Sequence, residues 1–143
     1  HFNAAPSPTD HEEAGIETFC LTPTGMPSTL KREYEDDASL IFPNNRFDLE
    51  NLQYAMQVQR TVLKISGARD HGVRRARFMT VLRGQNCPAI LVEGGYLSNP
   101  REARRIAEPA YRQKLAEAVA SAIIEKVQNP PPAVESAGKE EGK

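Results

Sequence analysis

The chain has 143 residues, of which 39% are hydrophobic and 6% aromatic, so we expect one domain with a modest core. Its 18 lysine and arginine residues nearly balance its 19 aspartate and glutamate residues, which argues against a dedicated nucleic-acid binder. No segment approaches the roughly 20 consecutive apolar residues that a membrane-spanning helix needs. The composition therefore indicates a globular domain with neither a membrane span nor a nucleic-acid partner.

The first half of the chain predicts one strand and two helices. Apolar residues alternate weakly over residues 15–21, which is typical of a strand. The acidic segment over residues 28–40 predicts a short helix with Ser28 as its N-cap. From residue 48 to about residue 66, apolar side chains recur near helical spacing, and Gly67 follows as the stop. We expect loops between these segments, because prolines and glycines gather there.

The second half predicts two strands and two helices. We place one strand at residues 78–82 and another at residues 88–92, with a Gly-Gln-Asn turn between them. Asn99 has the residue type of a helix N-cap, and a proline follows it. The helical pattern after Asn99 contains an internal proline, so we expect two successive helices, at about residues 100–107 and 109–127.

Together these segments predict an α/β fold, in which a mostly parallel, twisted sheet is flanked by helices in three layers. The run at residues 88–92 is short and apolar, as in strands that are covered on both faces. Residues 128–143 carry three prolines and almost nothing apolar to bury, so we expect a disordered tail. Folding is then left to residues 1–127, in which residues 24–46 form an insertion or a long loop.

Glu93 closes the predicted strand at residues 88–92, and Gly94 and Gly95 follow it directly. In open α/β sheets, ligands bind beyond the carboxyl ends of the strands, where glycine allows close approach of the backbone. This position makes Glu93 a candidate catalytic carboxylate. The alternative is a strand-end glutamate that caps the next helix or forms a surface ion pair.

The most specific motif of the chain is Val-Glu-Gly-Gly-Tyr-Leu-Ser-Asn-Pro at residues 92–100. Other blocks support it by their order along the chain, and with it they cover most of residues 1–127. They are His1-Phe2-Asn3, Gly-Ile-Glu-Thr-Phe at 15–19, Asp-His-Gly-Val at 70–73, residues 78–83, residues 88–91 and Tyr111-Arg112. In these blocks the chain resembles the zinc-dependent N-acetylmuramoyl-L-alanine amidases, which trim bacterial cell walls.

The resemblance implies a peptidoglycan hydrolase that cleaves the amide between N-acetylmuramic acid and L-alanine through a zinc-activated water. It makes His1 the last zinc ligand and Glu93 the general base. We add Asn3 and Arg83 as candidate substrate contacts. The resemblance also implies a periplasmic or extracellular location, and it suggests an activator protein as a partner besides the wall polymer.

The implied metal site is incomplete in this sequence. A catalytic zinc ion takes three protein ligands and keeps a position for water, and in the family a histidine and a glutamate precede the segment that begins here with His1. We therefore expect the sequence to be a piece of a longer protein, without the N-terminal part of the domain. Glu12, Glu13 and Glu17 are further carboxylates in this region, but their spacing does not favour a metal site.

The remaining histidines and the two cysteines have simpler expected roles. We expect His11, in a loop, and His71, in an Asp-His-Gly turn, to be polar surface side chains. Cys20 and Cys87 lie at predicted strand or strand-entry positions, where a small buried side chain is the ordinary role. A disulfide between them is the alternative.

The insertion carries four acidic residues, at positions 33 and 35–37. Some amidases of this type place a helix in this region that shields the metal until an activator removes it. We hypothesise that the insertion gates the site, against the simpler interpretation of a solvated acidic helix. Deleting residues 31–39 should then raise basal hydrolysis, and unchanged activity would count against gating.

Two alternatives to a zinc hydrolase remain open. A non-catalytic wall-binding or regulatory relative would keep the fold and lack two zinc ligands, which the coding sequence before His1 would reveal. A copper site made by a free amino terminus and the His1 imidazole would suit oxidative polysaccharide-cleaving enzymes, but it predicts a β-sandwich rather than helices. Metal analysis of the full-length protein separates the three hypotheses. The amidase should contain zinc, the non-catalytic relative no metal, and the oxidative enzyme copper.

Overall fold

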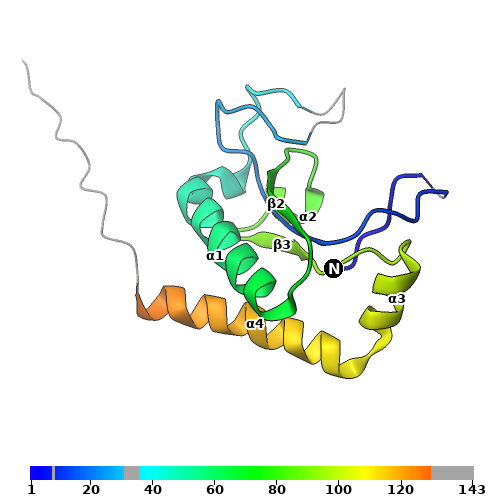
Figure 1. Ribbon diagram of the computed structural model, residues 1–143. Helices are drawn as coiled ribbons and strands as arrows, with labels where there is room; N and C mark the ends of the chain where they lie inside the picture. The colour runs from blue at the N-terminus through cyan, green and yellow to red at the C-terminus, as the bar shows by residue number, and fades with distance from the viewer. Residues whose placement is uncertain (8, 31–35, 130–143) are drawn as a thin grey trace, which may run out of the picture.

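A three-stranded sheet with helices packed against it forms the body of the protein (Figure 1). The computed structural model describes residues 1–7, 9–30 and 36–129. In chain order the elements are β1 (Ile16–Cys20), the 3-10 helix η1 (Pro43–Phe47), α1 (Asp48–Ser66), β2 (Asp70–Arg75), α2 (Thr80–Arg83), β3 (Ile90–Glu93), α3 (Pro100–Ala107) and α4 (Pro109–Gln128). The predicted α/β class is therefore confirmed.

β1 is the central strand of the sheet, whose order is β2-β1-β3. All five residues of β1 are buried, so both faces of this strand are covered. The sheet is mixed, because β1 pairs with β2 in parallel and with β3 in antiparallel orientation. In the antiparallel pairing Glu17 lies opposite Glu93, and Phe19 lies opposite Leu91. Residues paired in this way project from the same face of a sheet.

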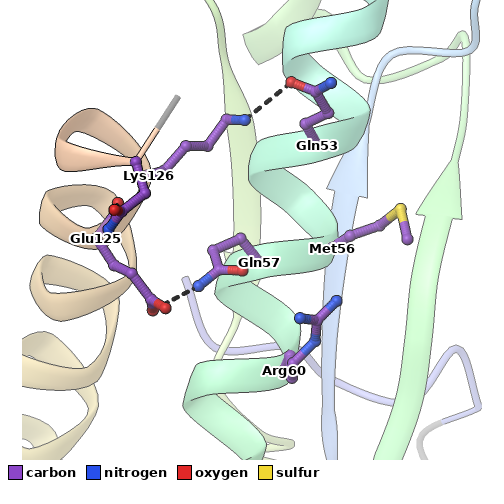
Figure 2. A pocket seen from close by; sticks show the side chains of 7 residues that line it. Gln53, Met56, Gln57, Arg60, Glu125 and Lys126 are labelled. Carbon is purple, nitrogen blue, oxygen red and sulfur yellow. Dashed lines mark hydrogen bonds between the residues drawn. The ribbon is translucent and has the colours of Figure 1, made fainter. Parts of the chain in front are cut away.

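One face of the sheet packs on α1 and α4. Side chains alternate between the two faces along a strand, and Ile16 and Val92 lie on this one. The buried side chains of α1 and α4 in the same cluster as Ile16 are Val58, Val62, Tyr111, Leu115, Ala118 and Ala122. The two helices lie side by side, and hydrogen bonds from Gln57 to Glu125 at 2.6 Å and from Lys126 to Gln53 at 2.8 Å join them (Figure 2). They form one supporting layer beneath the sheet.

The other face of the sheet carries a smaller apolar cluster and the two paired carboxylates. The buried members of this second cluster are Phe19, Ala76 and Leu82. Because Phe19 and Glu17 are two positions apart on β1, they share this face. Glu93 and Leu91 are also two positions apart, on β3, so they share this face as well. On this face, the apolar cluster around Phe19 is therefore followed along the strands by the carboxylates of Glu17 and Glu93. The two carboxylates form a polar site on the sheet.

The long helix and the two later helices are confirmed. α1 has the predicted bounds, and Gly67 ends it with a φ of 66°, in the left-handed region that glycine adopts readily. The Asn99 side chain caps α3 by accepting hydrogen bonds from the backbone N–H groups of Arg101 and Glu102. α3 and α4 are separate helices, and Pro109 begins the second, as the internal proline predicts.

The strand predicted at residues 78–82 is wrong. β2 lies earlier in the chain, at Asp70–Arg75, and Thr80–Arg83 forms the short helix α2. Phe78 and Met79 are apolar because they pack against the second cluster, and not because they pair in the sheet. β2 has a polar sequence, yet its pairing with the buried strand β1 decides its structure. Such tertiary context overrides intrinsic strand propensity.

The acidic helix predicted at residues 28–40 is not helical over its described residues, 28–30 and 36–40. The Ser28 hydroxyl caps no helix, since it hydrogen-bonds the Thr22 hydroxyl at 2.7 Å and also the Asp36 carboxylate. The acidic positions 33 and 35 lie outside the described residues. Most of the predicted tail, at residues 130–143, lies outside them as well.

Both cysteines are free, with Cys20 buried and Cys87 exposed. The structure thus shows separate thiols where a disulfide was the alternative. The prediction of a small buried side chain is correct for Cys20 and wrong for Cys87. Among the helices that the structure describes, none combines the length and the apolar character needed to cross a membrane.

Candidate functional site

The first residues of the chain lie along the segment that follows β3. Three backbone hydrogen bonds of 2.8 Å join the first three residues to residues 94–97. Asn3 and Tyr96 form a parallel bridge within this ladder. The ladder brings His1 next to Glu93, although 92 positions separate them in the sequence.

The His1 imidazole and the Glu93 carboxylate are in direct contact. Nδ1 of His1 lies 2.8 Å from Oε2 and 3.1 Å from Oε1 of Glu93. The His1 side chain is 66% exposed, whereas that of Glu93 is 7% exposed. Burial raises the pKa of the Glu93 carboxyl group, and the positive amino terminus of His1 opposes this effect. The pair thus joins a solvent-facing imidazole to a buried carboxyl group of raised proton affinity.

The loop after β3 is held in place by Glu102 of α3. Oε2 of Glu102 accepts a hydrogen bond of 2.7 Å from the N–H of Tyr96, and both oxygens lie 3.1 Å from the backbone nitrogen of Gly15. Gly95 has a φ of 135°, and a Cβ atom there would lie 3.2 Å from Oε2 of Glu102. Glycine is therefore required at this turn. Through Glu102 the turn is tied to the start of β1.

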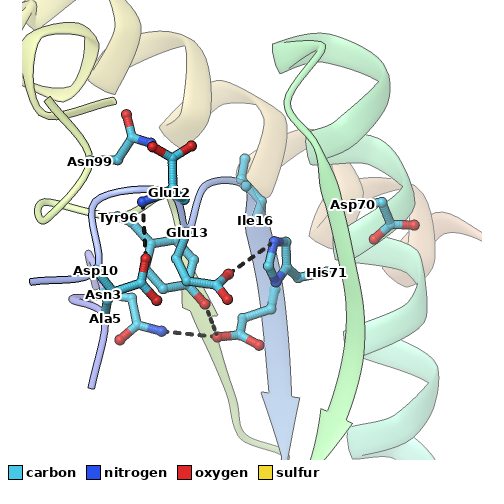
Figure 3. A network of polar contacts seen from close by, with 12 residues as sticks. Asn3, Ala5, Asp10, Glu12, Glu13, Ile16, Asp70, His71, Tyr96 and Asn99 are labelled. Carbon is cyan, nitrogen blue, oxygen red and sulfur yellow. Dashed lines mark hydrogen bonds and ion pairs between the residues drawn. The ribbon is translucent and has the colours of Figure 1, made fainter. Parts of the chain in front are cut away.

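Glu17 of β1 is a second buried carboxylate, and it binds both segments that form the site. Oε1 of Glu17 accepts hydrogen bonds from Nδ2 of Asn3 at 2.9 Å and from the hydroxyl of Tyr96 at 3.1 Å. Oε2 lies 3.5 Å from Nε of Arg74. Figure 3 shows Asn3 and Tyr96 directed toward one carboxylate. Burial, with the charge of Glu17 beside the hydroxyl, raises the pKa of Tyr96.

His71 and His11 differ from each other in their surroundings. His71 lies in β2, its side chain is 13% exposed, and its Nε2 is 3.8 Å from a carboxylate oxygen of Glu13 (Figure 3). Its ring centroid is 5.7 Å from that of Tyr96. The prediction of a surface turn for His71 is therefore wrong, because pairing with β1 makes residues 70–75 a strand. His11 is exposed, as predicted, and its Nδ1 contacts the carbonyl of Ser98.

Sequence reasoning missed the network around Glu17. Glu17 lies in the middle of β1, where every residue is buried. Glutamate is almost never fully buried in proteins unless it is paired. A glutamate in the middle of a predicted strand, between Ile16 and Phe19, was therefore the signal that could have identified it.

The two candidate substrate residues have different positions. The Asn3 side chain donates to Glu17 and accepts a hydrogen bond from the backbone N–H of Ala4, next to the site. The Arg83 guanidinium group donates to the carbonyl of Phe78 at 3.0 Å and lies 5.1 Å from the ring centroid of Phe42. Arg83 thus packs at the second apolar cluster. Substrate contact by Asn3 and Arg83 stays a prediction.

The donor set near His1 fits part of a zinc site. Imidazole and carboxylate groups are ordinary zinc ligands, and the Nδ1 atom of His1 faces the Glu93 carboxylate. Among residues 1–7, 9–30 and 36–129, no group of three or more His, Cys, Asp and Glu side chains is arranged to hold a metal ion. The described residues therefore offer one imidazole ligand beside a carboxylate, and a complete site requires further ligands.

Comparisons with known proteins point to one family. The family model for N-acetylmuramoyl-L-alanine amidase matches residues 1–125. The N-acetylmuramoyl-L-alanine amidase AmiA of Salmonella typhimurium is 25% identical over 137 residues, covering 81% of this chain and 47% of that protein. An uncharacterized cell wall amidase of Bacillus anthracis is 30% identical over 111 residues, covering 78% of this chain and 18% of its own length. The chain spans about half, or less, of the length of these relatives.

Solved structures show the same similarity. An N-acetylmuramoyl-L-alanine amidase from Clostridium difficile 630 superposes with a TM-score of 0.67 at 25% identity, over 92% of this chain and 56% of that one. The CwlD amidase from Clostridioides difficile, solved in complex with the GerS lipoprotein, gives a TM-score of 0.65 at 19% identity, over 90% and 52% of the two chains. The described residues therefore share their fold with part of these amidases.

Proposed function

Since the chain belongs to the N-acetylmuramoyl-L-alanine amidase family, we propose that the complete protein hydrolyses the amide bond between N-acetylmuramic acid and L-alanine in peptidoglycan. The observation that carries the proposal is the contact of 2.8 Å between the His1 imidazole and the buried Glu93 carboxylate. We place the activity in the periplasm or outside the cell, because the wall polymer is found there.

Glu93 is the general base of the proposed reaction. An amide carbonyl is a poor electrophile, so the attacking water has to lose its proton as the bond to carbon forms. A carboxylate whose proton affinity is raised by burial is suited to accept that proton and to pass it to the leaving nitrogen. Glu93 lies beside the His1 imidazole, which is the more exposed partner of the pair.

His1 is the zinc ligand that this chain contributes. Bound zinc supplies a Lewis acid that polarises the amide carbonyl and lowers the pKa of water. The imidazole is exposed enough to bind a metal ion, and Nδ1 faces the same space as the Glu93 carboxylate. The chain spans about half the length of its relatives, so the proposal assigns the other ligands to the part of the family's domain outside this chain.

A protein activator is part of the proposal as a partner. The amidase that was solved with the GerS lipoprotein has the same fold, and a binding partner can act on a segment that limits access to the site. The hypothesis that the insertion gates the site stays a prediction, because residues 31–35 lie outside the described residues.

The products of wall digestion test the proposed function. The complete protein is incubated with purified peptidoglycan, and new amino-terminal L-alanine and new reducing sugar ends are both quantified. We expect new L-alanine amino termini without new reducing ends, their loss after chelation of zinc, and their return when zinc is added. Wall binding without release of L-alanine termini, even after zinc is added, would contradict the proposal and identify a non-catalytic relative.

A further inference from the structure

Glu17 is placed where a carboxylate is costly. It is buried, and it lies directly opposite Glu93 in the antiparallel pairing of β1 and β3. Like charges opposite each other destabilise a pair of strands, and a buried carboxylate needs hydrogen-bond donors to offset its loss of water. An apolar residue would suit this strand position better if packing alone decided it.

The donors that offset this cost belong to the two segments that carry the proposed chemistry. Asn3 lies two residues after His1, and Tyr96 lies three residues after Glu93. Both donate to the same oxygen of Glu17, at 2.9 and 3.1 Å. Asn3 and Tyr96 are also the residues paired in the bridge between the two segments. Oε1 of Glu17, on the central strand, therefore binds both residues of the Asn3–Tyr96 bridge, and this bridge lies next to the contact between His1 and Glu93.

Other contacts near His1 also indicate that Glu17 helps to fix its position. The His1 side chain is largely exposed, so packing does little to fix it. A few backbone hydrogen bonds join the first residues to the loop after β3. Glu17 adds side-chain hydrogen bonds from the rigid centre of the sheet, and Arg74 on β2 lies beside its second oxygen at 3.5 Å.

From these contacts we propose that Glu17 is a positioning residue of the amidase site. Its Oε1 atom fixes Asn3 and Tyr96 and thereby holds the imidazole of His1 against the carboxylate of Glu93. The inference rests on the proposed amidase activity and deepens it, because it names the group that aligns the imidazole with the base.

Two substitutions of Glu17 separate positioning from simple packing. Glu17→Gln keeps an oxygen that accepts from Asn3 and Tyr96, and Glu17→Met keeps the length of the side chain without an acceptor. In the complete protein acting on a soluble muropeptide, we expect Glu17→Met to lower kcat by roughly 10- to 100-fold with little change in KM. Glu17→Gln should restore kcat to within about threefold of the wild type.

Metal retention provides a readout that is independent of turnover. We expect Glu17→Met to lose zinc to a chelator faster than the wild type, because the His1 ligand is less well fixed. Glu17→Gln should retain zinc as the wild type does. Thr18→Val is the matched control, since it removes a buried hydrogen bond of 2.8 Å to Gln59 from the opposite face of β1. It should lower the melting temperature and leave kcat and zinc loss unchanged.

Tyr96→Phe keeps the inference testable if Glu17→Met does not fold. It removes a single hydroxyl group, and we expect kcat to fall by roughly 3- to 10-fold with a nearly unchanged melting temperature. In the variant that combines it with Glu17→Met, the two losses should overlap, because both break the same hydrogen bond.

Three results would overturn the inference. They are a folded Glu17→Met variant with wild-type kcat, a Tyr96→Phe variant with wild-type kcat, and strictly additive losses in the combined variant. The proposed function fails separately, when the wild type itself releases no L-alanine amino termini, and the inference then fails with it. An active wild type with a normal Glu17→Met variant refutes the inference alone.

Discussion

Glu17 and Glu93 face each other across β1 and β3, and each carboxylate has its own set of partners. Glu93 contacts the imidazole of His1, whereas Glu17 contacts Asn3, Tyr96 and Arg74. The antiparallel pairing thus sets two buried carboxylates with different partners on one face of the sheet. The contacts of each carboxylate, rather than its residue type, indicate its role.

Gly95 should tolerate no side chain. Gly95→Ala adds a Cβ atom 3.2 Å from both Glu102 and Ile106 at a φ of 135°, so we expect a loss of roughly 1–3 kcal/mol in the free energy of unfolding. The turnover rate should fall as well, because Glu102 holds the loop that carries Tyr96. Denaturant unfolding and muropeptide hydrolysis measure the two effects.

Gly84→Ala serves as the control for this substitution. A Cβ atom at Gly84 meets nothing within 4 Å, so the change should stay within about 0.5 kcal/mol. Equal stabilities of the Gly95→Ala and Gly84→Ala variants would show that the turn after β3 is not constrained as described.

Arg77 should be important for stability. It is 2% exposed, and its Nη1 lies 2.6 Å from the Asp36 carboxylate, while Nη2 donates to the carbonyl groups of Pro23 and Met26. Arg77→Met removes the buried guanidinium group that donates to the Asp36 carboxylate and to these carbonyl groups, and breaking a buried ion pair in this way costs roughly 3–5 kcal/mol. Thermal unfolding of Arg77→Met and of the exposed Arg60→Met would measure it. Similar melting temperatures would contradict the prediction.

The two thiols should react at different rates. Cys87 is exposed and Cys20 is buried, so a water-soluble thiol reagent should modify one cysteine in the folded protein and both after unfolding. Cys87→Ala should abolish the rapid reaction, and Cys20→Ala should leave it intact. Absence of any reactive thiol under non-reducing conditions, restored by a reductant, would instead reveal a disulfide.

Cys20 should also make stability depend on alkaline pH. Burial raises the pKa of its thiol from 9.0 to about 11. The unfolded chain therefore loses this proton at lower pH than the folded one, so stability is complete below pH 9 and declines as pH rises toward 11. The loss reaches roughly 2–3 kcal/mol for this group. Unfolding free energies of the wild type and Cys20→Ala should converge over this interval, and a constant difference would contradict the prediction.

The sequence predicts best those elements whose signals are local. α1 is defined by its own helical spacing and by Gly67, and α3 by the Asn99 cap, so both have the expected bounds. β2 forms because it pairs with β1, and no local sequence pattern reveals that pairing. The strand was instead predicted at residues 78–82, because Phe78 and Met79 are apolar. Pairing between distant segments is therefore where the sequence-based prediction failed.

The same distinction applies to the site. Glu93 became a candidate base from its place at a strand end and from the family motif, and His1 became a candidate zinc ligand from the family resemblance alone; both roles stay predictions. Their contact required the ladder between the first residues and residues 94–97. The partners of Glu17 come from three separate segments, so the sequence shows its burial at most and not its hydrogen bonds.

Replacement of Glu93 tests the central claim most directly. In the complete protein we expect Glu93→Gln to lower kcat on a muropeptide by roughly 10²- to 10⁴-fold, with its zinc content and melting temperature close to those of the wild type. The exposed carboxylate variant Glu12→Gln, made in parallel, should keep full activity. A Glu93→Gln protein that turns over at the wild-type rate would contradict the assignment of Glu93 as the general base.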